Sequence, residues 1–183
     1  MSMPELRVLA AGLLLAAWAS GAGAAEALQA PRLGRPLDAQ EVTRWDLSVF
    51  PDGRGLPAGR GNAIEGAALF RRHCAACHGA SGRGASAEEL AGGTEPLTSP
   101  TPDKTIGLYW PYATTIFDFV RRAKPMTAPG TLSADEVYAI TAYLLYANGL
   151  LGETDEMDAR TLPKLRMPNR DGFIGIDAPL PPR

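Results

Sequence analysis

The feature that most constrains this chain is the motif Cys74-Ala75-Ala76-Cys77-His78, which contains both cysteines of the sequence. Two cysteines three positions apart, near the end of a helix, can reach both vinyl groups along one edge of a porphyrin. The residue that follows then lies beneath the iron, and a neutral imidazole is a good axial ligand for low-spin haem iron. The motif predicts one haem c, attached covalently through Cys74 and Cys77, with His78 as an iron ligand.

Three other kinds of site use closely spaced cysteines, and none explains the whole motif. A thioredoxin-like redox pair follows a strand in a βαβ unit, whereas the residues before Cys74 have a helical pattern. A zinc site needs a third and a fourth ligand, but the only other histidine is His73 and there is no further cysteine. A disulfide between Cys74 and Cys77 leaves His78 without a role. Haem attachment is the favoured interpretation, and we expect His73 to face solvent or a haem propionate and not to bind the iron.

The N-terminus has the pattern of an export signal. Residues 1–25 combine Arg7, an apolar run over residues 8–18 and small residues up to Ala25. The run is too short to span a bilayer, which takes about 20 residues. We expect a signal peptide that is cleaved near Ala25, with an uncleaved anchor as the alternative. No other stretch is long and apolar enough to cross a membrane, so the mature chain is predicted to be periplasmic without a membrane span.

Length and composition indicate one globular domain with extensions. The 183 residues are 45% apolar and 21% charged, which excludes a disordered or fibrous chain. A formal net charge of −2 gives no electrostatic reason to expect a nucleic-acid partner. We expect an irregular N-terminal extension over residues 26–60, a domain over residues 61–150 and an extended proline-rich tail over residues 151–183.

The local sequence patterns predict helices and loops, with no convincing strand. Two capping boxes, Asn62 with Glu65 and Ser133 with Glu136, mark the starts of two helices. Asn148-Gly149 ends the second of these helices. The predicted helical segments are a short helix within residues 38–50, a helix from residue 62 to the cysteines, a turn within residues 85–91, and helices over residues 113–123 and 133–148.

Apolar positions within these helices predict how they pack. In the segment 113–123 we expect Ile116, Phe119 and Val120 to share one buried face. Gly66, Phe70 and Cys74 follow one another at four-residue spacing. This pattern resembles the first helix of class I cytochromes c, where a glycine and an aromatic residue allow the first and last helices to cross closely. Tyr143-Leu144 would be the other half of that crossing.

Longer stretches resemble one particular family, the cytochrome c subunits of periplasmic sulfite and sulfane dehydrogenases. The matching segments are residues 45–46, 51–53, 106–123, 132–144 and 167–173. The resemblance implies an all-α class I cytochrome c fold, with three to five helices around one covalently bound haem and irregular extensions at both ends. It also implies a redox subunit that accepts electrons from a separate molybdopterin catalytic subunit and passes them to a downstream carrier.

Aromatic residues before residue 113 are candidates for the haem surroundings. Trp110, Tyr109 and Tyr112 would cover the haem or donate a hydrogen bond to a propionate, and a role in packing alone is an equal alternative. We expect Trp110 and Tyr112 to belong to the cofactor-binding residues.

The sixth iron ligand is the point at which the chain departs from the family. Family members tend to have Ala-Met-Pro where this chain has Ala123-Lys124-Pro125. Met126 is the preferred candidate, because a soft thioether is the usual partner of histidine at this position. Lys124, through a neutral amine, and Met167, in the tail, are the alternatives.

Electron transfer without catalysis is the leading functional prediction. The alternative is a free-standing haem enzyme, peroxidase-like or thiosulfate-oxidising, with an exchangeable distal ligand. Such an enzyme needs an open distal position or a ligand such as a cysteine thiolate, and the sequence has no third cysteine.

Overall fold

The structure, a computed structural model, describes residues 33–175. The predicted signal peptide lies outside the described residues. Contacts divide the chain into two units, Met1–Asp38 and Ala39–Arg183, and the second unit contains the helices and strands described below. Within residues 33–175, no helix has the length and apolar character needed to cross a membrane.

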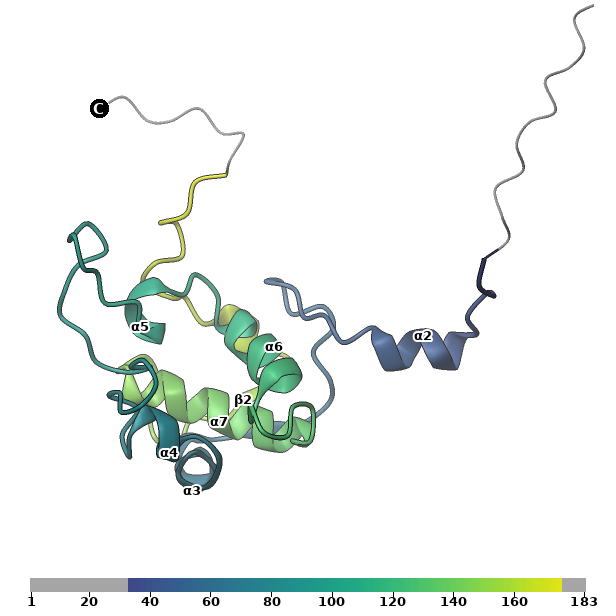
Figure 1. Ribbon diagram of the computed structural model, residues 1–183, viewed down its shortest axis with the longest axis horizontal. Coiled ribbons are helices and arrows are strands. Elements are labelled where there is room, and N and C mark those ends of the chain that lie inside the picture. The colour runs from purple at the N-terminus through teal and green to yellow at the C-terminus, as the bar shows by residue number, and fades with distance from the viewer. Residues whose placement is uncertain (1–32, 176–183) are drawn as a thin grey trace, which may run out of the picture. The chain divides into compact units, whose positions relative to one another are not determined.

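The second unit is built almost entirely of helices and loops (Figure 1). Its elements are α2 (Ala39–Trp45), β1 (Arg60–Gly61), α3 (Ala63–His73), α4 (Ala75–His78), α5 (Ile106–Tyr109), α6 (Ala113–Ala123), α7 (Ala134–Ala147), β2 (Met157–Asp158) and the 3₁₀ helix η1 (Leu162–Lys164). The all-α architecture predicted from the sequence is confirmed. The two strands are only two residues long each, and they pair antiparallel.

Both predicted capping boxes are formed. The Glu65 N–H donates to Asn62 Oδ1 over 3.0 Å, and the Asn62 N–H donates to Glu65 Oε2 over 3.3 Å. Ser133 and Glu136 repeat this exchange at the start of α7. Each box satisfies two backbone N–H groups that have no partner inside the helix, so both helix starts are determined locally.

The segment 85–91, predicted to contain a helical turn, is a loop. Its backbone N–H groups bond to distant carbonyls: Ala87 donates to Cys77, and both Leu90 and Ala91 donate to Gly82. These N–H groups are therefore unavailable for a helical turn. The short helix α5, which was not predicted, follows this loop region.

One predicted core position of α6 is wrong. Ile116 and Val120 are buried as expected, but Phe117 is fully buried while 45% of Phe119 is exposed. The buried stripe runs through Ala113, Ile116, Phe117 and Val120, at the spacing of one helical face. Phe119 lies on the flank of this stripe, with its ring 6.0 Å from that of Trp110.

Helices α3 and α7 cross in direct backbone contact (Figure 1). A Cβ atom on Gly66 would overlap the carbonyl oxygen of Ala139 and lie 2.7 Å from Cβ of Tyr143. Beside this contact the rings of Phe70 and Tyr143 pack with centroids 4.9 Å apart. The crossing predicted from Gly66, Phe70 and Tyr143 is present, and only glycine fits at its centre.

The chain before β1 is attached to α6 and α7. The Val49 N–H donates to the Asp118 carboxylate over 2.9 Å, and Tyr138 donates its hydroxyl proton to the Pro57 carbonyl over 2.9 Å. Asp118 also pairs with Arg122, one turn further along α6. The part of the predicted N-terminal extension that follows α2 therefore packs on the helical core.

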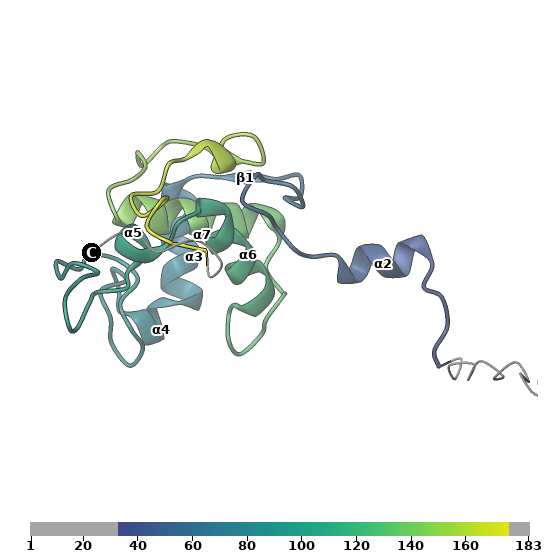
Figure 2. The same ribbon diagram turned by 90° about the horizontal axis from the view of Figure 1, so that it is seen from above.

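The first half of the predicted tail is part of the core. Met157, Leu162 and Met167 are buried together with residues of α6 and α7. Figure 2 shows this segment on the side of α7 opposite α4. The residue pattern does not identify these three positions as core, because apolar residues at five-residue intervals match neither the helical nor the strand repeat.

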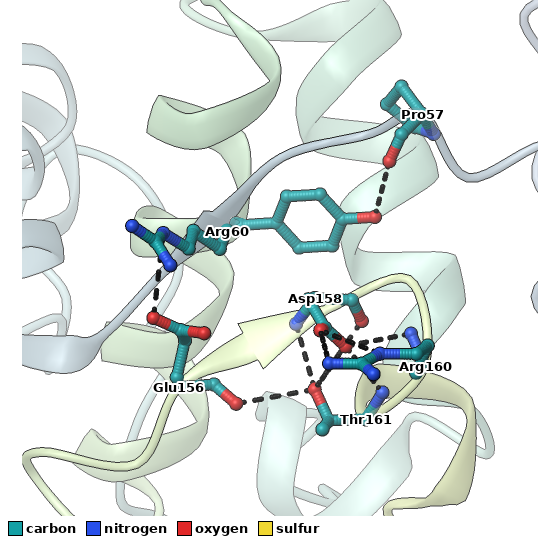
Figure 3. A network of polar contacts seen from close by, with 7 residues as sticks. Pro57, Arg60, Glu156, Asp158, Arg160 and Thr161 are labelled. Carbon is teal, nitrogen blue, oxygen red and sulfur yellow. Dashed lines mark hydrogen bonds and ion pairs between the residues drawn. The ribbon is translucent and has the colours of Figure 1, made fainter.

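Polar contacts close the turn that follows β2 (Figure 3). The Asp158 carboxylate accepts hydrogen bonds from the backbone N–H groups of Arg160 and Thr161, each over 2.8 Å. These bonds lower the pKa of Asp158 to about 2. Arg60 of β1 forms an ion pair with Glu156 over 3.6 Å, which connects the turn to the segment before α3.

Replacing Gly66 by valine tests the helix crossing. The new side chain would overlap the α7 backbone, so we expect the free energy of unfolding to fall by about 1–3 kcal/mol, the usual result of overpacking a core. Denaturant unfolding of the haem-loaded protein measures the effect. Ala68→Ser, at an exposed position of the same helix, is the control, and a Gly66→Val variant as stable as this control would contradict the close contact.

The Asp158 turn predicts a specific acid sensitivity. Since folding depresses the pKa of this carboxyl from 3.8 to about 2, its contribution to stability is complete above about pH 4 and disappears as the pH falls toward 2. We expect Asp158→Asn to be less stable than the wild type at pH 7, with the difference shrinking between pH 4 and 2. Asp171→Asn, which removes an exposed carboxylate, is the control. A stability difference that stays constant from pH 7 to pH 2 would argue against this assignment.

Candidate haem site

The motif Cys74 to His78 forms one tight helical turn that continues from α3. The Cys74 N–H donates to the Phe70 carbonyl over 2.8 Å, which is the last bond of α3. The N–H groups of Cys77 and His78 then both donate to the Cys74 carbonyl, over 3.1 and 3.0 Å. The end of the helix therefore fixes the backbone of the two cysteines and the histidine relative to one another.

The orientation of His78 is set by a backbone carbonyl. Its Nδ1 lies 2.7 Å from the carbonyl oxygen of Glu88. Because a carbonyl only accepts, Nδ1 carries the proton, and Nε2 keeps the lone pair that a metal ligand needs. Two further bonds hold the loop in place: Gly84 N–H donates to the His78 carbonyl, and Ala87 N–H donates to the Cys77 carbonyl.

Both cysteines are free thiols, half-buried at Cys74 and exposed at Cys77. Burial raises the pKa of the Cys74 thiol, while the positive charge of Lys124 acts in the opposite direction. Two free thiols beside an imidazole with an available Nε2 are the donor set that a covalently attached haem requires. The residues present therefore fit haem c. Within residues 33–175 there is no cluster of three or more His, Cys, Asp or Glu side chains that could hold a bare metal ion.

The aromatic residues predicted to surround the haem divide into two groups. Trp110 is half-buried and packs edge-on against Phe119 of α6. Tyr109 and Tyr112 instead contact the C-terminal segment: Phe173 packs on Tyr109, and the Arg170 guanidinium lies 4.2 Å from the ring centre of Tyr112. A role of Trp110 and Tyr112 in haem binding remains a prediction.

The three candidates for the sixth ligand lie in different surroundings. Lys124 is half-buried at the end of α6, and its Nζ lies 5.1 Å from the ring centre of Phe119. Met126 is 76% exposed, and Met167 is 1% exposed within the core. His73 is partly exposed, where solvent exposure was expected.

Asn148 has a structural role that the sequence does not indicate. Its Oδ1 accepts from the Gly107 N–H, and its Nδ2 donates to the carbonyls of Leu90 and Leu144. One side chain thus joins the end of α7, the start of α5 and the loop that carries Glu88. In the sequence, Asn148 indicates only the end of a helix, because all three of its bonding partners are backbone groups and leave no mark in the residue pattern.

Asn148→Ala is expected to loosen the loop that orients His78. Removing the amide leaves the partly buried Gly107 N–H and Leu90 carbonyl without partners, at a cost of about 1–3 kcal/mol. Denaturant unfolding should show the lower free energy of unfolding, and the Soret band should change at a lower denaturant concentration than in the wild type. Asn169→Ala, which removes one bond to the Tyr109 carbonyl, is the control. Equal behaviour of the two variants would contradict the joining role of Asn148.

Comparison with known proteins agrees with this site. Residues 63–148 match the family model of cytochrome c. The chain is also similar to a chain in the crystal structure of the sulfane dehydrogenase SoxCD from Paracoccus pantotrophus, with 44% sequence identity and a TM-score of 0.76 over 81% of this chain and 73% of that chain. A search of curated proteins found no significant match. The chain therefore belongs to the class I cytochromes c, in the family of the cytochrome c subunits of sulfite and sulfane dehydrogenases.

Proposed function

We propose that this protein is the monohaem electron-accepting subunit of a periplasmic sulfur-compound dehydrogenase. The observation that carries the proposal is the turn from Cys74 to His78, in which the Glu88 carbonyl fixes the Nδ1 proton and leaves Nε2 for iron. Haem c, when bound there, supplies reversible one-electron chemistry. The domain assignment follows the sequence: a signal peptide over residues 1–25, a cytochrome domain over residues 61–150, and extensions on either side.

The chain's own residues would attach and tune the haem. The thiols of Cys74 and Cys77 would each add across one vinyl group of a bound haem, an addition that needs no oxidant or reductant. The Glu88 carbonyl draws on the Nδ1 proton of His78, which makes Nε2 a stronger donor and keeps the ring from rotating. Cys74, Cys77 and His78 would therefore hold a haem and supply one ligand to its iron.

The proposed donor is a molybdopterin catalytic subunit. Two observations support it: the sequence resemblance to sulfite and sulfane dehydrogenase cytochromes, and the similarity to a chain of SoxCD over most of both chains. In this arrangement the sulfur chemistry belongs to the partner, and the cytochrome accepts its electrons one at a time and passes them to a downstream carrier.

Reconstitution with the catalytic subunit tests the function. The full chain is exported from a host with c-type maturation machinery, alone and together with its molybdopterin partner. We expect one covalent haem per chain, a stable complex, and reduction of the haem by sulfite or a sulfane substrate only when the partner is present. Cys74→Ala/Cys77→Ala, the control, should lack covalent haem. Substrate oxidation by the cytochrome alone would instead favour the free-standing haem enzyme.

A further inference from the structure

Three residues are candidates for the second ligand of an iron bound by His78, and the structure places them in different surroundings. Met167 is 1% exposed and packs in the core with Met157 and Leu162. It belongs to the C-terminal segment, which lies on the side of α7 opposite the His78 turn (Figure 2). The Met167 side chain is therefore buried in the core, and its segment is poorly placed to reach an iron bound by His78.

Met126 is two residues beyond α6 and is 76% exposed. The hydrogen bonds described for its loop are local: Ala128 N–H donates to the Pro125 carbonyl, and Thr131 donates its hydroxyl proton to the Ala128 carbonyl. No packing against the core directs the Met126 side chain, so coordination by Met126 would have to order a side chain that the fold leaves exposed.

Lys124 is held more firmly than Met126. It caps α6 through its N–H, which donates to the Val120 carbonyl over 3.1 Å. Its Nζ lies 5.1 Å from the ring centre of Phe119, and Phe119 packs in turn on Trp110. The end of α6 and the α4 turn reach the same side of the unit, away from the C-terminal segment (Figure 2).

The charges around Lys124 also favour its amine as a ligand. Its positive charge opposes the rise that burial causes in the pKa of the Cys74 thiol, so the amine is within electrostatic range of that haem-attachment residue. Among residues 33–175 no carboxylate forms an ion pair with Lys124, and Asp118, the acidic residue of α6, is paired with Arg122. Lys124 is a half-buried residue whose amine has an aromatic ring beside it but no paired carboxylate, so it can accept a further partner.

We propose that the side-chain amine of Lys124 is the sixth ligand of the haem iron, opposite His78. This inference rests on the proposed attachment of haem at Cys74 and Cys77. The amine coordinates in its neutral form and releases its proton to solvent, as metal ligands generally do on binding. Two nitrogen ligands replace the histidine and methionine pair, and since methionine ligation raises the reduction potential, the potential of this haem is lower than that of a methionine-ligated relative.

Spectroscopy of the haem-loaded chain tests the ligand directly. The oxidised wild type should be low-spin and lack the far-red thioether-to-iron charge-transfer band. Lys124→Met should gain this band, and its reduction potential should rise. Lys124→Ala should show a high-spin component or a changed low-spin electron paramagnetic resonance signal. Two controls should keep the wild-type spectrum: Met126→Leu, which removes the competing thioether, and Lys104→Met, which makes the same substitution at an exposed lysine.

Two results would overturn the proposal. A thioether band in the wild type that disappears in Met126→Leu or Met167→Leu would assign the ligand to that methionine. A wild-type spectrum retained in Lys124→Ala would show that the amine does not bind iron. The alkaline pyridine haemochrome spectrum reports thioether attachment whatever the distal ligand is. If the c-type haemochrome is absent, haem attachment itself is refuted. If it is present together with either result above, only the role of Lys124 is refuted.

Discussion

The contact between Gly66 of α3 and the backbone of Ala139 in α7 is the constraint on which the rest of the structure depends. With no side chain at residue 66, the two helices approach until the α7 backbone fills the place of a Cβ atom. Phe70, one turn further along α3, then packs on Tyr143, one turn further along α7. Close packing of this kind resists displacement, so the crossing fixes where α3 ends.

The turn from Cys74 to His78 is linked to this crossing at two points, one in α3 and one in α7. Cys74 takes the last hydrogen bond of α3, so the position of α3 determines where the cysteines and His78 lie. At the far end of α7, Asn148 bonds to the Leu90 carbonyl, and the loop before Leu90 supplies the Glu88 carbonyl that orients the His78 ring. One helix pair therefore positions His78, the proposed ligand, and the loop anchored to that pair selects the tautomer in which Nε2 has a free lone pair.

What the sequence predicts well is what short-range physics determines. The capping boxes at Asn62 and Ser133 and the span of α6 depend on residues within one or two turns of one another, whereas the crossing at Gly66 was expected from the resemblance to class I cytochromes c. The failures involve distant partners. The 85–91 loop donates its N–H groups to the carbonyls of Cys77 and Gly82, and the Asn148 amide bonds to three separate segments. The apolar residues Met157, Leu162 and Met167, whose spacing matches no regular repeat, enter the core. For α6 the helical repeat was predicted correctly, but it placed Phe119 on the buried face, where the structure buries Phe117.

If His78 and Lys124 bind the iron as proposed, its two ligands come from differently built segments, and this difference bears on how the potential of the haem can change. His78 is fixed by the end of a helix and by a loop with several tertiary hydrogen bonds, so a substitution there disturbs the fold. The segment after α6 is different, because the hydrogen bonds described for residues 124–131 stay within the loop or reach only the last turn of α6. An exchange between methionine and lysine at residue 124 therefore leaves the core contacts intact. Since the distal ligand is a strong determinant of the potential, the fold permits one substitution to retune the haem without altering the helices that hold it.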